Sequence, residues 1–311
     1  MKILITGGCG FIGSHLVEHY QGRAEIVVLD DLSSGYLENL SHLQCDIVKG
    51  SVLDRPLVER CCADVDYVFH LAALVSVAES MSKPLETAEI NILGLLNVLQ
   101  ASARAGVKKL CFASSAAVYG DSGDAIKTET AKPDPCSPYA ISKLTGESFC
   151  DLYARENWLP TTSLRFFNVF GPRQDPRSAY SAAVAIFLDR ALRHEPITIF
   201  GDGKQTRDFV FVQDIVSALS FVAEKPECQG FYNASVSIRS VAEHLIEKCK
   251  SRSLLQFAAR RPGDLQHSQA NANRLHAAGW TAEHNFVTGL ETTIEASALR
   301  SLNRRGASFV G

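Results

Sequence analysis

The chain has 311 residues, of which 46% are hydrophobic and 21% are charged, and its formal net charge is −3 at pH 7. Such a composition is ordinary for a globular protein, and this length fits one elaborate domain or two modest ones. The weak net charge gives no electrostatic reason to expect nucleic acid or an anionic membrane as a partner, and no apolar run is long enough to span a membrane. The spacing of the nine cysteines and nine histidines matches no metal site, and we expect reduced thiols in a cytoplasmic protein.

The N-terminal segment predicts a dinucleotide-binding unit. A buried strand over 2–6 leads directly into Gly7, Gly10 and Gly13, after which helical spacing begins. Glycine is needed where a backbone turns sharply or approaches a pyrophosphate closely, and the free N–H groups of the helix then face the phosphates. A second strand ends at Asp30, where a carboxylate accepts hydrogen bonds from ribose hydroxyls and repels a 2′-phosphate. The order of these features favours NAD over NADP.

Strands and helices continue to alternate along the chain. The expected elements are strands at 45–48, 67–70, 107–114 and 161–167 and helices at 55–62, 84–105 and 138–155. This alternation predicts an α/β fold with a doubly wound parallel (Rossmann) sheet, in which ligands bind at the carboxyl ends of the strands. The pattern loosens after Asn168. We expect an NAD-binding domain from 1–172 and 209–235, and a smaller α+β substrate domain from 173–208 and 236–311.

A tyrosine and a lysine four residues apart indicate acid/base chemistry. Ser137 is a good N-cap and Pro138 suits the first helical position, so Tyr139 and Lys143 share a helix face. A phenol has a pKa of about 10, and lowering it by roughly three units requires about 4 kcal/mol. The Lys143 ammonium and a cationic nicotinamide ring together would favour the phenolate. Taken alone, the pair fits equally well a tyrosine and a surface lysine on an amphipathic helix.

These features together resemble the extended short-chain dehydrogenase/reductases, specifically the NAD-dependent sugar-nucleotide epimerase/dehydratase family, closest to UDP-glucose and UDP-N-acetylglucosamine 4-epimerases. The resemblance covers essentially the whole chain. It is carried by the glycine motif, Asp30, His70-Leu71-Ala72-Ala73, Asn91, Ser114-Ser115, the Tyr139/Lys143 pair and the segments 165–172, 201–210 and 261–265.

The resemblance implies a role for each matching position. Tyr139 would be the acid/base, Lys143 would hold the nicotinamide ribose and tune Tyr139, and Ser115 would bond the reacting hydroxyl. NAD would be bound by Gly7, Gly10, Phe11, Ile12, Gly13, Asp30, Asp31, Ser33, Ser34, Gly35, Ser51, Val52, Leu71, Ala72, Ala73, Asn91, Ala113, Tyr139, Lys143 and Phe166. The UDP-sugar substrate would be bound by Val75, Ser115, Ala116, Asn168, Thr198, Phe200, Arg207, Arg261, Asp264 and Ser268. Ser51 stands where many relatives carry an Asp that bonds the adenine amino group.

The residues after Ser115 bear on the reaction. In the family that this chain resembles, 4,6-dehydratases carry an Asp-Glu pair at this place and UDP-glucuronate decarboxylases carry a Glu. This chain has Ala116 and Ala117 instead. Alanine neither donates nor accepts a proton, so we expect NAD-dependent 4-epimerisation through a 4-keto sugar.

Ser268 resembles the gatekeeper of UDP-hexose 4-epimerases, where a small residue admits a 2-acetamido group. This favours UDP-N-acetylglucosamine/N-acetylgalactosamine, with possible UDP-glucose/galactose activity, unless Ser268 is merely a small loop residue.

Two other functions remain open. A UDP-glucuronate 4-epimerase would share the alanines and would want an extra cation in the sugar pocket, which Arg173 or Arg177 would provide. A non-catalytic NAD-binding scaffold is a different class, and such proteins usually lose the Tyr or the Lys. The resemblance also implies a homodimer formed through a four-helix bundle of the helices at 84–105 and 138–155.

Overall fold

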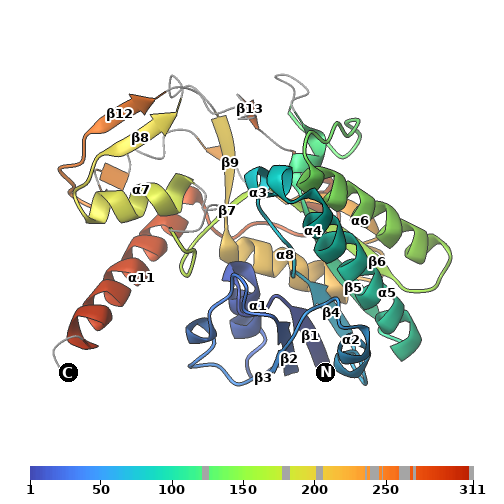
Figure 1. The fold of residues 1–311 in the computed structure, drawn as a ribbon. Helices are drawn as coiled ribbons and strands as arrows, with labels where there is room; N and C mark the ends of the chain where they lie inside the picture. The colour runs from blue at the N-terminus through green and yellow to red at the C-terminus, as the bar shows by residue number, and fades with distance from the viewer. Residues whose placement is uncertain are drawn as a thin grey trace.

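A computed structural model describes residues 1–120, 126–176, 183–200, 206–234, 237–238, 245–246, 248–258, 267–268 and 271–307. Its centre is a seven-stranded sheet in the order β10-β6-β5-β4-β1-β2-β3 (Figure 1). The strands are β1 Lys2–Thr6, β2 Glu25–Asp30, β3 Asp46–Lys49, β4 Tyr67–His70, β5 Lys109–Ser115, β6 Thr161–Phe166 and β10 Gly230–Ala234. Every neighbouring pair is parallel, which confirms the predicted fold class.

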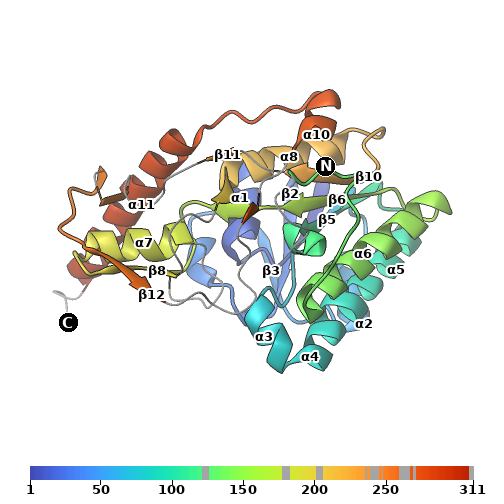
Figure 2. The same ribbon diagram turned by 90° about the horizontal axis from the view of Figure 1, so that it is seen from above.

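Helices cover both faces of this sheet (Figure 2). One face carries α1 Phe11–His19 and α8 Val212–Glu224, and the other carries α2 Arg55–Cys61, α5 Gly94–Ala105 and α6 Pro138–Arg155. Strand β1 shows why both faces are needed. Its Ile3 and Ile5 belong to the core under α1 and α8, whereas Leu4 belongs to the core under α2 and α5. Successive side chains of a strand point to opposite faces, so each face requires its own helical cover.

The predicted continuous helix over 84–105 is wrong in one respect. The structure divides it into α4 Pro84–Ala88, a π-helical turn over Glu89–Leu93 and α5. Asn91 lies in that turn, where its side-chain oxygen accepts from the Leu74 N–H (2.8 Å) and its amide donates to the Leu74 carbonyl (3.0 Å) and Ser142 Oγ (3.0 Å). These bonds to non-helical backbone accompany the local departure from α-helical geometry. A short helix before it, α3 Val77–Ser82, is not expected from the sequence and is capped by Ser76.

The segments after Phe166 build smaller sheets beside the main one. Strand β9 Thr206–Phe211 pairs with β7 Asn168–Phe170, β11 Ser237–Ile238 and β13 His267–Ser268, and β8 Ile197–Phe200 pairs with β12 Leu255–Ala258. Helices α7 Ala183–Leu192, α10 Asn273–Ala277 and α11 Phe286–Ala307 complete this part of the chain (Figure 1). The polypeptide returns to the main sheet as β10, next to β6, as the sequence predicts. The boundaries of the two domains stay a prediction.

The described part of the chain was compared with the requirements of a membrane-spanning helix and of a metal site. None of its helices has the length and apolar character required to cross a bilayer. The described residues also contain no cluster of three or more His, Cys, Asp or Glu side chains suited to a metal ion. All nine cysteines are free, and Cys136 is the exposed one among them.

Candidate active site

A cleft of about 2070 Å³ runs along the carboxyl ends of the central strands. It is lined by the segments that follow β1, β2, β4, β5 and β6 and by residues of α3, α6, α7 and β8. This is the edge at which ligands bind in doubly wound sheets, because the loops that leave the strands there are free to surround them. Its size suits two extended ligands rather than one small molecule.

At Gly7 and Gly13 the neighbouring backbone leaves no room for a side chain. Gly7 has φ +72°, and a Cβ added there would lie 2.8 Å from the Ala72 nitrogen. A Cβ on Gly13 would lie 2.2 Å from the Gly7 carbonyl oxygen, so α1 packs directly onto the turn. Gly10 caps α1 without a side-chain hydrogen bond, which leaves the first N–H groups of the helix directed at the cleft. This is a cradle that fits the pyrophosphate of a dinucleotide.

Asp30 holds that loop in place. Its two carboxylate oxygens accept from the Cys9 N–H (2.9 Å) and the Leu32 N–H (2.8 Å), and the side chain lines the cleft. Burial raises the pKa of Asp30, while the two backbone hydrogen bonds lower it by less. Because each carboxylate oxygen has a second acceptor position, these bonds leave Asp30 able to accept from ribose hydroxyls. The sequence predicts the ribose contact, and the fixing of the glycine loop is a finding of the structure.

Tyr139, Lys143 and Ser115 lie together at the middle of the cleft. As predicted, Ser137 caps α6 by accepting from the Ala140 N–H (3.1 Å), with proline in the first turn. Lys143 Nζ donates to the Ala113 carbonyl (2.8 Å) and lies 5.8 Å from the centroid of the Tyr139 ring. Ser115, at the end of β5, lines the same cleft and interacts with the Tyr139 side chain, which lowers the pKa of the phenol against the larger effect of burial. Helix α6 and strand β5 therefore bring the predicted catalytic groups into contact.

Burial dominates the electrostatics of the trio. It raises the pKa of Tyr139, and the interaction with Ser115 lowers that pKa by less. Burial also lowers the pKa of Lys143 to about 8, and the ammonium donates to the Ala113 carbonyl. The expectation that Lys143 and a cationic nicotinamide ring together favour the phenolate stays a prediction, because the second cation belongs to the cofactor.

Most of the other predicted residues also line the cleft. Those lining it are Gly7, Gly10, Phe11, Ile12, Gly13, Asp30, Asp31, Ser33, Ser34, Gly35, Val52, Leu71, Ala72, Ala73, Val75, Ala113, Ala116, Phe166, Asn168, Thr198 and Phe200. Asn91 is buried behind the cleft, and the Ser51 hydroxyl accepts from the Leu53 N–H instead (3.1 Å). Arg261 and Asp264 lie outside the described residues, as do the side chains of Arg207 and Ser268.

Several lining residues are not found by sequence reasoning. They include Tyr36, Ile186, Phe187 and Arg190. No local pattern marks these four, because they reach the cleft only through the packing of α7 and of the loop after β2. Exposed Arg190 pairs with Glu195 (2.6 Å). Such a solvent-exposed pair is weak, and leaves the guanidinium available at the cleft wall.

Arg173, one of the two candidate cations for the sugar pocket, lines the cleft and already has several partners. Its side chain is only 6% exposed, forms an ion pair with Glu18 and donates to His15 Nδ1 (2.6 Å) and to the Asn39 carbonyl (3.4 Å). A hydrogen bond from the Tyr36 hydroxyl to Asp175 (2.7 Å) lies in the same region. The loops after β2 and β7 are thereby clasped together at the cofactor end of the cleft. Arg177 lies outside the described residues.

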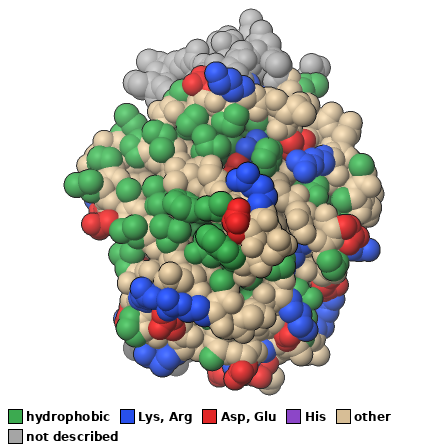
Figure 3. Space-filling model, turned by 90° about the vertical axis from the view of Figure 1, so that its right-hand side faces the viewer, with side chains coloured by type: hydrophobic (Ala, Val, Ile, Leu, Met, Phe, Trp, Pro, Cys, Tyr) green, Lys and Arg blue, Asp and Glu red, His purple; other side chains and the backbone are tan. Residues whose placement is uncertain are grey.

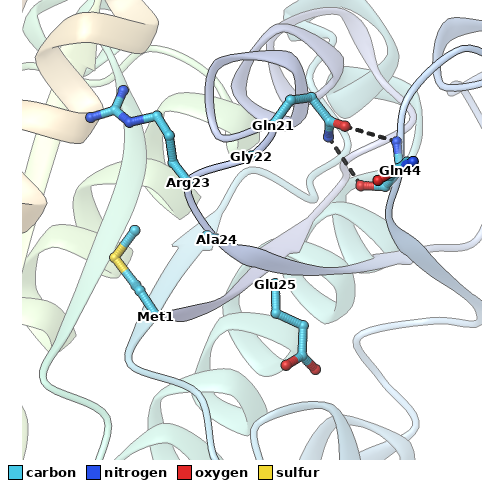
Figure 4. Close-up of a pocket in the computed structure, with 7 residues that line it drawn as sticks. All are labelled: Met1, Gln21, Gly22, Arg23, Ala24, Glu25 and Gln44. Carbon is cyan, nitrogen blue, oxygen red and sulfur yellow. Dashed lines mark hydrogen bonds between the residues drawn. The ribbon is translucent and has the colours of Figure 1, made fainter.

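A second hollow lies at the opposite end of the sheet (Figure 4). It measures about 460 Å³ and is lined by Met1, Gln21, Gly22, Arg23, Ala24, Glu25 and Gln44. Gln21 and Gln44 exchange two hydrogen bonds there, of 2.9 and 3.0 Å. It opens at the amino ends of β1 and β2, where this fold does not place its ligands. We do not assign it a function.

Comparisons with known proteins agree with this geometry. The sequence pattern of the NAD dependent epimerase/dehydratase family matches residues 3–235. A UDP-glucose 4-epimerase from Thermotoga maritima, solved with UDP-glucose, has 36% identity and a TM-score of 0.91, covering 96% of this chain and 99% of that one. A UDP-N-acetylglucosamine 4-epimerase from Methanobrevibacter ruminantium, in complex with UDP-N-acetylmuramic acid, has 35% identity and a TM-score of 0.91, covering 96% and 98%.

A relative with a different activity is also similar. The UDP-N-acetyl-alpha-D-glucosaminuronate decarboxylase of Bacillus cytotoxicus is 38% identical over 228 residues, which are 70% of this chain and 69% of that protein. The chain belongs to the NAD-dependent epimerase/dehydratase family of sugar-nucleotide enzymes. It is an enzyme with NAD as its cofactor.

Replacing Gly13 with alanine tests the cradle. The added methyl group would lie 2.2 Å from the Gly7 oxygen, whereas one on Gly10 would lie at 3.2 Å. Because overpacking of this kind costs about 1–3 kcal/mol, we expect Gly13→Ala to weaken NAD binding by roughly 10- to 100-fold. Gly10→Ala should weaken it less, as measured by titration calorimetry. Unchanged affinity in Gly13→Ala would contradict the assignment of this turn as the pyrophosphate site.

Titration of Lys143 predicts a pH dependence. With a pKa of about 8, this lysine is an ammonium at lower pH and neutral at higher pH. We expect kcat/KM to fall as the pH rises through about 8, because the positive charge beside Tyr139 is then lost. Lys143→Arg keeps its charge at every pH tested, so its residual activity should lack this alkaline limb. A limb of the same position in Lys143→Arg would assign it to another group.

Proposed function

We propose that the protein is an NAD-dependent UDP-sugar 4-epimerase acting through a 4-keto intermediate, with UDP-N-acetylglucosamine/N-acetylgalactosamine as the preferred pair and UDP-glucose/galactose as further substrates. The observation that carries this proposal is the contact of Ser115, Tyr139 and Lys143 within one cleft, beside Ala116 and Ala117. Ser115, Tyr139 and Lys143 supply acid/base chemistry at carbon 4 of the sugar. The two alanines supply none for the loss of the 6-hydroxyl.

The chain's own residues move and hold one proton. Tyr139 takes the proton of the sugar 4-hydroxyl and later returns it, while Ser115 orients that hydroxyl. Lys143, anchored on the Ala113 carbonyl, keeps a positive charge near the phenol. NAD, which the glycine turn, Asp30 and Lys143 would hold, would supply the reversible hydride transfer at carbon 4 that these residues lack. The proton and the hydride are both restored, so one turnover consumes nothing.

Ala116 and Ala117 separate this reaction from those of other family members. Both line the cleft, in the short helix Ala116–Tyr119 that follows Ser115, and the Ala117 N–H donates to Ser115 Oγ (3.2 Å). A dehydratase would need an acid and a base at these places to expel the 6-hydroxyl. Methyl groups do neither, which also argues against the decarboxylase activity of the Bacillus relative.

The backbone register supports a substrate role for Ser268. Ser268 on β13 is directly paired with Arg207 on β9, so two residues predicted to contact the substrate are neighbours across strands. The similarity to a UDP-N-acetylglucosamine 4-epimerase is consistent with a pocket that admits a 2-acetamido group. The alternative UDP-glucuronate 4-epimerase has a weaker basis, because Arg173 lines the cleft but is already paired with Glu18. A scaffold without activity has no reason to keep the complete trio.

We also propose that the protein is a cytoplasmic homodimer. Figure 3 shows hydrophobic side chains gathered on the face formed by α4 to α6, and three of them are strongly exposed. They are Leu85 (79%), Leu93 (52%) and Ile141 (51%). A second copy meeting this face would cover them in a four-helix bundle. The nine free thiols fit a reducing compartment.

Replacing Tyr139 with phenylalanine tests the catalytic assignment. We expect turnover to fall by roughly 10²- to 10⁴-fold, since the acid/base is lost, with unchanged fold and NAD content. The assay separates the 4-epimers by chromatography after incubation with UDP-N-acetylglucosamine, UDP-glucose or UDP-glucuronate. Turnover of Tyr139→Phe at the rate of the unaltered protein would sink the proposal. No turnover of any substrate by the unaltered protein would favour the scaffold.

Replacing Ser268 with tyrosine tests the substrate preference. A bulky side chain at a gatekeeper should exclude the acetamido group, so we expect UDP-N-acetylglucosamine turnover to be lost while UDP-glucose turnover remains. The measurement is the ratio of kcat/KM for the two substrates. Ser268→Thr provides the control, because its added volume is small. Equal survival of both activities in Ser268→Tyr would show that other residues size the pocket.

Replacing Leu93 with glutamate tests the dimer. A charge in the centre of the proposed bundle should shift the protein to the monomer in analytical ultracentrifugation. Leu254 is 72% exposed at the start of β12, away from these helices, and Leu254→Glu should leave the oligomeric state unchanged. A monomeric unaltered protein, or a dimer that survives Leu93→Glu, would refute this interface.

A further inference from the structure

A buried ionic group lies directly behind the catalytic residues. Glu147 stands one helical turn after Lys143 on α6, and its side chain is 5% exposed. Its Oε1 accepts from Ser114 Oγ (2.5 Å) and from Arg165 Nε (2.8 Å), and its Oε2 accepts from Arg165 Nη2 (2.6 Å). One carboxylate thus accepts three hydrogen bonds from two residues of the central sheet.

Those two residues occupy a single rung of the sheet. Ser114 on β5 is the register partner of Arg165 on β6, and the next residue of β5 is Ser115. Glu147 therefore joins the catalytic helix to the rung beside the residue that interacts with the Tyr139 side chain. The helix also presses on the sheet here, because a Cβ added at Gly146 would lie 2.6 Å from the Phe112 ring. These contacts fix the height of α6 over β5.

Arg165 holds the carboxylate with little freedom. Its guanidinium lies 3.9 Å from the centroid of the Phe231 ring and 4.7 Å from that of Tyr119. Its Nη1 has no hydrogen-bond partner among the described residues. Burial of such an ion pair is costly and often adds nothing to stability compared with apolar residues of the same size. Stability alone therefore gives a weak reason for this group.

The charges around Lys143 point to a second effect of Glu147. Burial lowers the Lys143 pKa, and Cys150 and Glu147 oppose that shift. Burial raises the pKa of Cys150 to about 12, so its thiol is neutral at physiological pH. The other titratable groups around this position are His70 on β4, Cys111 on β5, Arg165 on β6 and Tyr139 on α6, none of which carries a negative charge there. Glu147 is the anion among these groups.

We propose that Glu147 is a positioning residue for the reaction: its hydrogen bonds to Ser114 and Arg165 fix Tyr139 and Lys143 relative to Ser115, and they hold its carboxylate one helical turn from Lys143. This inference rests on the proposed roles of Tyr139 and Lys143. It adds that the geometry of the trio depends on one buried carboxylate that does not line the cleft.

Two substitutions separate the geometric from the electrostatic effect. Glu147→Asp keeps the charge but shortens the reach, so kcat should fall by roughly 10- to 100-fold, with KM for the UDP-sugar within about 3-fold and the alkaline limb unmoved. Glu147→Gln keeps the length but removes the charge, so the alkaline limb of the pH profile should move to lower pH by about one unit. Glu59→Gln is the matched control, because Glu59 also binds two arginines but is exposed on the surface.

Glu147→Leu combined with Arg165→Met guards against misfolding, because it leaves no buried charge unpaired. We expect this double variant to keep the melting temperature and NAD content of the unaltered protein, yet to show a low kcat. Restoration of normal kcat and of the normal alkaline limb would show that the ion pair serves only the fold, and would overturn the proposal. A Glu147→Gln variant with unchanged kcat and pH profile would overturn it equally. Inactivity of the unaltered protein would instead be a failure of the proposed function.

Discussion

The close approach of backbone to backbone at the end of β1 is the constraint on which the cofactor half of the site depends. Gly7 and Gly13 leave no room for a methyl group against Ala72 and against each other. This contact places the first turn of α1 at the cleft with its N–H groups free. Asp30 then fixes the same turn from β2 through the Cys9 N–H. The consecutive elements β1, α1 and β2 therefore meet at one place, whose shape fits a pyrophosphate and its ribose.

The catalytic half is built on the opposite principle, the burial of polar side chains. Lys143 is almost fully buried, and its ammonium donates to the Ala113 backbone carbonyl. Burial raises the pKa of Tyr139 and lowers that of Lys143, so both groups are held closer to their neutral forms than in water. The protein alone thus keeps the tyrosine protonated. Ionisation then depends on a charge that arrives with the cofactor, which couples proton transfer to occupancy of the cleft.

How far the sequence predicts this structure depends on whether a feature is local. The cap at Ser137, the helix phase of Tyr139 and Lys143, and the glycine turn are set by neighbouring residues, and the structure confirms them. The π-helical turn at Asn91 is not predictable, because it follows hydrogen bonds to Leu74 and Ser142, from other parts of the chain. The raised pKa of Tyr139 is not predictable for the same reason, since burial in the folded protein is its largest cause. The partners of Arg173 likewise come from distant parts of the chain, Glu18, His15 and Asn39.

The contacts between the loops after β2 and β7 bear on how readily a coenzyme could be exchanged. Tyr36 and Asn39 both donate to the Cys9 carbonyl in the glycine loop, and they meet Asp175 and Arg173 from the other side. All four residues line the cleft, so this bridge forms one of its walls beside the glycine loop. For a dehydrogenase that must exchange its coenzyme every cycle, such a wall would slow each turnover. An epimerase that returns the hydride to the same sugar has no need for that exchange, so the wall carries no such cost.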